Sequence, residues 1–120
     1  MSKIHFEKVN LNEIENFRCV FDFISSGKQK GSIDEKGLSS LLAELRKTRF
    51  HPAGGNGSWD YGSWVDALNQ AAISFQSLEV SNVGEGVLVF TEHSWPSGGL
   101  ETVEEIVKIF GGRVVLNDAS

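Results

Sequence analysis

This sequence has little cysteine, little proline and no long apolar stretch, and each absence excludes a class of protein. Its single cysteine, Cys19, excludes an internal disulfide and favours a reducing compartment. Cys19 lies in an apolar helical pattern, which predicts a buried structural thiol. Two prolines argue against long disordered segments. Since neither a membrane-spanning run nor a signal peptide is visible, we expect one cytoplasmic domain over residues 1–120 with no membrane partner.

Basic residues are scarce after His51. Of the 11 Lys and Arg residues only Lys108 and Arg113 follow it, so the formal charge is +2 over residues 1–50 and −7 over residues 51–120. Phosphate binding needs concentrated Lys and Arg, and the whole chain carries −5, so we expect no nucleic-acid partner. The charge split favours recognition of a basic partner.

Motifs for catalysis or metal binding are also missing. Glu92, His93, His51 and Asp60 are possible ligand types, but no pair has the spacing of a metal motif. The serines lack the surroundings of a nucleophile, and the glycines of residues 54–57 lack the Lys-Ser/Thr of a phosphate-binding loop. We therefore predict no catalytic residue, no metal and no cofactor.

The apolar spacing predicts strands that alternate with helices. Residues 3–9 and 113–116 are typical of strands, and 87–90 form a continuous apolar run typical of a central strand covered on both faces. Ser32 and Glu35 resemble a capping box before a helix over residues 33–49. Residues 51–58 form a glycine-rich loop, and residues 73–80 fit either a helix or a strand. The other expected helices span residues 12–27, a segment that starts near 59–63, and 101–110.

One helix joins the apolar runs at Val87 and Val114, which predicts a βαβ unit with two parallel strands. The expected fold class is therefore α/β or α+β. Its sheet has three or four strands with a parallel central pair, and about four helices pack on it.

Aromatic and acidic residues are concentrated in the last 70 residues. Trp and Tyr dominate interface hot spots, and carboxylates attract basic partners. The candidate partner-binding residues are Trp59, Asp60, Tyr61, Trp64, Asp66, Glu92 and Trp95. Trp64 is also in helical register with Ala67 and Leu68, which favours the core, and Trp59 and Trp95 could instead seal the ends of the sheet.

One segment resembles a known family. Tyr61-Gly62, followed by Asp66-Ala67-Leu68, is similar to the aromatic-Gly and Asp-Ala-Leu helix of barstar-type inhibitors, and the order of elements is similar as well. The helix over residues 33–49 and the loop after it depart from that pattern, as do Asn69 and Gln70 where the family has Trp-Asp. The resemblance implies a small acidic bacterial immunity protein of the kind found in contact-dependent growth inhibition.

Three hypotheses follow for function. The first is an immunity protein that binds and neutralises a basic toxin domain, a nuclease, through the acidic and aromatic surface. The alternative is a small-ligand-binding domain in which Trp and Tyr side chains line a pocket. An enzyme using His51, Asp60 or His93 is the least favoured of the three.

Overall fold

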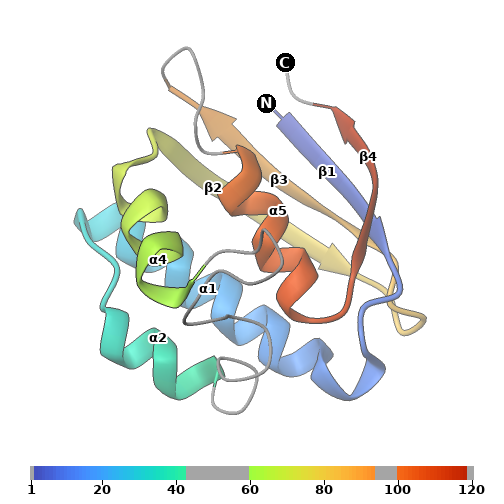
Figure 1. Ribbon diagram of the computed structural model, residues 1–120. Helices are drawn as coiled ribbons and strands as arrows, with labels where there is room; N and C mark the ends of the chain where they lie inside the picture. The colour runs from blue at the N-terminus through green and yellow to red at the C-terminus, as the bar shows by residue number, and fades with distance from the viewer. Residues whose placement is uncertain (1, 43–59, 94–99, 119–120) are drawn as a thin grey trace.

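The computed structural model describes residues 2–42, 60–93 and 100–118 and shows a sheet packed by helices (Figure 1). The predicted loop at residues 51–58 lies outside the described residues, as does the end of the predicted helix over 33–49. The described elements are β1 (Ser2–Glu7), a 3-10 turn (Leu11–Glu13), α1 (Ile14–Lys30), α2 (Glu35–Leu42), α4 (Tyr61–Gln70), β2 (Ile73–Val80), β3 (Gly86–Glu92), α5 (Leu100–Ile109) and β4 (Arg113–Asp118). None of these helices is long and apolar enough to cross a membrane.

The four strands form one antiparallel sheet in the order β2-β3-β1-β4. The predicted parallel central pair is therefore wrong, whereas the α+β class is confirmed. Helix α5 does connect β3 to β4, and these two strands run in the same direction because both are antiparallel to β1. The error arose because β1, from the far end of the chain, is inserted between them. Local spacing carries no signal for that insertion.

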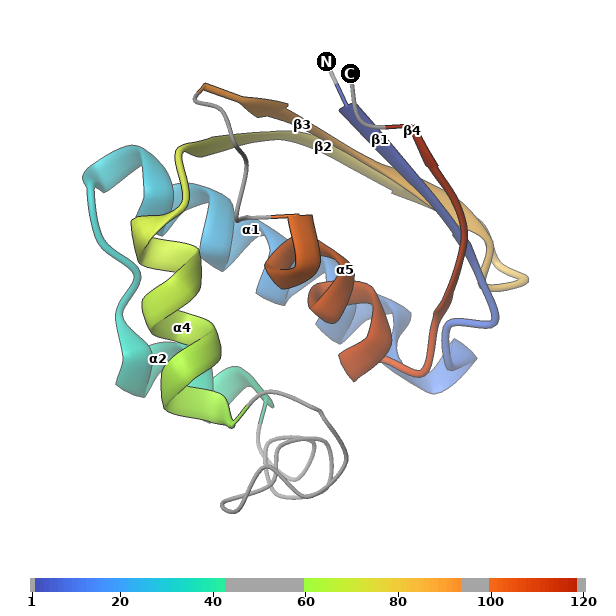
Figure 2. The ribbon, with the colours of Figure 1, turned by 45° about the horizontal axis from the view of Figure 1, so that its top comes forward.

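All described helices lie on one face of the sheet, and the other face is open (Figure 2). Strands β1 and β2 likewise share a direction, with β3 between them. This pair of interleaved split β-α-β units is the ferredoxin-like order of elements, here with α2 and α4 added between α1 and β2. A sheet with one open face is half-exposed at alternate positions. Val87 and Val89 are accordingly half-buried, so β3 is not covered on both faces as predicted.

Residues 73–80, which fitted either helix or strand, form β2. The pairing of β2 with β3 shifts register between Phe75 and Ser77, so Gln76 is an extra residue in the strand. Phe75 and Leu78 both face the helices although three positions separate them. A bulge of this kind interrupts the two-residue alternation, which explains why the sequence pattern was ambiguous.

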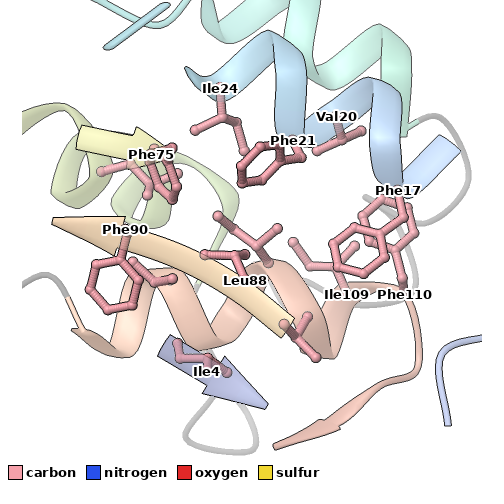
Figure 3. Close-up of a cluster of buried hydrophobic side chains, with 14 of the residues drawn as sticks. Ile4, Phe17, Val20, Phe21, Ile24, Phe75, Leu88, Phe90, Ile109 and Phe110 are labelled. Carbon is pink, nitrogen blue, oxygen red and sulfur yellow. The ribbon is translucent and has the colours of Figure 1, made fainter. Parts of the chain in front are cut away.

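The core lies between the covered face of the sheet and the helices α1 and α5 (Figure 3). Aromatic rings join the layers: Phe17 of α1 stacks on Phe110 at 5.0 Å, and Phe21 meets Phe75 edge-on at 5.7 Å between ring centroids. Side chains labelled in this cluster come from β1, α1, β2, β3 and the end of α5: Ile4, Phe17, Val20, Phe21, Ile24, Phe75, Leu88, Phe90, Ile109 and Phe110. Burial of these side chains supplies the main driving force for folding.

Three local predictions on the helices also need correction. Helix α1 continues to Lys30 and ends at Gly31, whose φ of +102° is a left-handed cap that glycine adopts without strain. Its buried positions include those of Phe17, Val20 and Phe21, so Cys19 falls on the outer side and its thiol is exposed rather than buried. Helix α2 begins at Glu35 and is capped by Asp34, whose Oδ1 accepts from the Lys36 amide at 3.2 Å, and not by Ser32.

Candidate functional site

Helix α4 begins with a well-made N-terminal cap at Asp60. The Asp60 carboxylate accepts one hydrogen bond from the Ser63 amide at 2.8 Å and another from the Ser63 hydroxyl at 2.9 Å. These bonds hold the pKa of the Asp60 carboxyl below its usual 3.8, with the Ser63 backbone amide as the largest cause. The side chain is therefore an oriented, ionised carboxylate at the positive end of a helix dipole.

The start of α2 adjoins the start of α4 through Tyr61. The Tyr61 hydroxyl donates to the backbone carbonyl oxygen of Glu35 at 2.6 Å, which links the first turns of the two helices. A hollow opens at this junction. It is lined by Asp34, Glu35, Lys36, Ser39 and Tyr61. Two acidic side chains and the aromatic ring therefore face the same space, with Lys36 as the basic member of the lining.

Gly62 leaves room between two of the carboxylates. A Cβ atom built at Gly62 would lie 3.7 Å from Asp60 Oδ1 and 4.0 Å from Glu35 Oε1. Both carboxylates therefore lie close to the backbone of Gly62, where no side chain separates them. Asp66 lies farther along the exposed side of α4, about 9 Å up the helix axis from Asp60. We refer to Asp34, Glu35, Asp60, Tyr61 and Asp66 as the acidic patch.

The structure brings three of the predicted site residues together on α4. Asp60 and Tyr61 are half-buried at its start, and Asp66 is exposed and accepts a hydrogen bond from Gln70 at 3.0 Å. Trp64 is in the core: its side chain is 0% exposed, and its indole N–H donates to the Thr102 carbonyl oxygen at 3.0 Å. Trp64 therefore offers no surface to a partner, which corrects its place among the candidates. Trp59 and Trp95 lie outside the described residues.

Glu92 is not part of the acidic patch. It ends β3 opposite Ile73, which follows the C-terminal end of α4. The acidic patch is centred on the other end of that helix, about 15 Å away along its axis. One carboxylate oxygen of Glu92 is buried and has no hydrogen-bond partner among the described residues. Glu92 and Asp60 therefore do not form one continuous surface.

Asp34 and Glu35 were missed as site residues. In the sequence they belong to a helix start, which is a sufficient explanation for acidic residues at that position. Their proximity to Asp60 depends on the packing of α2 beside α4, fixed by the contact between Tyr61 and Glu35. In the sequence, an Asp precedes both α2 and α4, which could have suggested that the two helix starts are alike. That pattern does not show that the two helix starts lie close together in the fold.

In the described part of the chain, a metal ion or an activated nucleophile would need particular side chains to lie close together. No group of three or more His, Cys, Asp or Glu side chains there is arranged to hold a metal ion. His93 Nε2 lies 2.6 Å from Ser74 Oγ on the exposed surface near the end of β3. Among the described residues no carboxylate bonds to this histidine, so the pair lacks the orienting third group of a catalytic triad.

Comparisons with known proteins return no match: no family model, no curated protein and no solved structure is similar to this chain. Function therefore has to be inferred from the site, because one fold can host many functions.

Proposed function

We propose that this chain is an inhibitor of the immunity-protein class, which binds and neutralises a basic toxin domain such as a nuclease. The acidic patch supports this proposal. It presents the carboxylates of Asp34, Glu35 and Asp60 around Tyr61, with Lys36 as the basic side chain in the hollow between them. Carboxylates held in this way can take the place of the phosphates that a nuclease active site attracts.

The patch is ordered before any partner arrives. Asp60 and Asp34 are held by backbone amides of their own helices, and Tyr61 is held by the Glu35 carbonyl. A surface that is already ordered loses less conformational entropy on association. Tyr61 offers an apolar ring beside these charges, which suits an interface anchor.

The charge of the patch is expected to act mainly on the rate of association. Negative potential steers a basic domain into encounter and can raise the association rate about tenfold or more at low ionic strength. Inhibition then follows from physical coverage of the toxin's active site, without chemistry by the inhibitor. On this proposal the protein works in the cytoplasm of the bacterium that makes it. The alternative of a Trp-lined ligand pocket is not favoured, since Trp64 lies in the core.

The test uses substitutions that remove charge and keep shape. The variant Asp34→Asn/Glu35→Gln/Asp60→Asn retains side-chain oxygens that can cap both helices. A matched control, Glu15→Gln/Asp22→Asn/Glu85→Gln, removes three charges from exposed residues away from the patch. Where the gene immediately upstream encodes a large secreted protein with a basic C-terminal domain, that domain is the partner to purify for stopped-flow binding and for a toxicity assay in cells.

The patch variant is expected to associate about tenfold more slowly than the control at low salt, with the difference largely lost near 1 M salt. Cells that make the toxin domain should survive with the wild-type protein and with the control, and less well with the patch variant. Equal rates for both variants at low salt would place the interface elsewhere. Absence of any binding or protection would reject the inhibitor function itself.

A further inference from the structure

The face of the sheet that carries no described helix has apolar side chains on both sides of a central histidine, His5. Strand β1 presents Lys3, His5 and Glu7 there, because Ile4 and Phe6 point into the core. The register places His5 beside Val87 of β3 on one side and beside Leu116 of β4 on the other. One row of side chains thus crosses all four strands, with the exposed Glu79 of β2 beside Val87 at one end.

Large apolar side chains on this face remain open to solvent. Val115 is 58% and Leu116 is 56% exposed, and Val87 and Val89 are half-buried. A shallow hollow lies beside them, and its lining combines Val87 and Val115 with polar and acidic residues, among them His5, Glu7 and Glu85. Apolar side chains that are gathered on one face mark an interaction site more often than scattered single residues do.

The charges along β1 indicate what covers this surface. Lys3 and Glu7 lie two positions on either side of His5, so a positive and a negative side chain flank this central residue. Consider a two-fold axis that lies between the two sheets, over His5, and runs perpendicular to the strands. This axis would place Lys3 of each copy opposite Glu7 of the other copy. Residues that meet their counterparts in this reciprocal way are the mark of a two-fold symmetric interface.

We propose that this face binds a second copy of the chain, with the two sheets packed face to face about a two-fold axis through the row of Val87, His5 and Leu116. Sheets pack about 10 Å apart, which allows the valines and leucines of the two copies to interdigitate. The acidic patch lies on the helical side of the molecule, away from this face (Figure 2). The dimer would therefore present two free acidic patches.

The size of the face predicts a dimer that dissociates on dilution. Four strands about 4.8 Å apart and six residues long form a surface of about 14 by 20 Å. That is well below the about 800 Å² per partner of standard interfaces, so the dimer should be weak. Monomer should prevail in dilute solution, and dimer should form only at high protein concentration.

Sedimentation equilibrium over a concentration series tests the proposal. The wild-type chain should move from 13.2 kDa toward twice that mass as the concentration rises. Leu116→Lys should raise the dissociation constant at least tenfold, because it brings two like charges together near the axis. Val83→Lys is the control: Val83 is a 62% exposed apolar residue in the turn after β2, outside the face. A wild-type chain that stays monomeric at millimolar concentration would overturn the dimer.

A charge exchange tests the arrangement of the two copies. Lys3→Glu and Glu7→Lys should each weaken the homodimer by placing like charges opposite one another. Glu7 also lies 3.8 Å from Arg113, but that pair is on the surface and contributes little to folding, which a urea denaturation curve would verify. An equimolar mixture of the two variants should restore association as a heterodimer, since every Glu then meets a Lys. If mixing restores nothing while the wild type dimerises, the copies meet through another surface and the proposal fails.

Discussion

The ammonium nitrogen of Lys28, near the end of α1, lies 2.7 Å from the carbonyl oxygen of Leu68 in the last turn of α4. It also donates to the carbonyl oxygens of Asn69 and Ala71. The last carbonyls of a helix have no partner within the helix, and a cation there also interacts favourably with the dipole. Lys28 therefore anchors α4, whose opposite end carries Asp60 and Tyr61.

Lys28→Met should lower the free energy of unfolding by about 1–3 kcal/mol, because it keeps the aliphatic stem but leaves the α4 carbonyls without their donor. The measurement is urea denaturation followed by circular dichroism. Lys30→Met, at an exposed position on the same helix, is the matched control and should be within about 0.5 kcal/mol of wild type. Equal losses for both variants would mean that the contact with α4 contributes nothing specific.

The cap at Asp60 should give stability a defined pH dependence. The folded-state pKa of this carboxyl is below 3.8, so its contribution is fully present above 3.8 and is lost as the pH falls through the folded value. Asp60→Asn can retain the cap oxygen but does not titrate. The advantage of wild type over Asp60→Asn in chemical denaturation should therefore be unchanged from neutral pH to about pH 5 and should shrink as the pH falls below 3.8. An advantage that grows on acidification would contradict the assignment of Asp60 as an ionised cap.

The elements could be predicted from the sequence far better than their arrangement. Apolar spacing located α1, α5 and β3 because each depends on nearby residues, and the joining of β3 to β4 by α5 was also correct. The insertion of β1 between them depends on pairings with Leu88 and Val114, more than 80 residues away. The pairing of strands that are so far apart in the chain depends on the packing of the whole core, and it produces no pattern in the sequence of either strand.

In the candidate site too, residues that are close together in the chain could be predicted, whereas contacts between distant elements could not. Asp60, Tyr61 and Asp66 were predicted because they are close together in the chain. Trp64 was ambiguous because a tryptophan suits both a core and an interface, and only its contact with α5 decides between them. Asp34 joins the acidic patch through the packing of α2 against α4, which no periodicity encodes.

Trp64→Ala should lower the free energy of unfolding by about 3–5 kcal/mol, since it removes a completely buried side chain and leaves a cavity. Tyr61, three residues earlier, supplies the comparison. Tyr61→Phe removes only the hydroxyl that bonds to Glu35 and should cost about 0.5–1.5 kcal/mol. Thermal and urea unfolding of both variants measure the difference. A small loss for Trp64→Ala would indicate that this side chain is not part of the core.

Neighbouring residues of β3 offer the most direct check of a sheet with one open face. Leu88 points into the core and is 0% exposed, whereas Val87 points to the open face. Leu88→Asp should cost at least about 3 kcal/mol, because it buries a carboxylate without a partner. Val87→Asp should cost less than about 1.5 kcal/mol at concentrations where the chain is monomeric, since its carboxylate stays in water. Glu85→Lys, in the exposed turn before β3, should be nearly neutral. Comparable losses at Leu88 and Val87 in dilute protein would mean that both faces of β3 are covered, and the one-sided architecture would then be wrong.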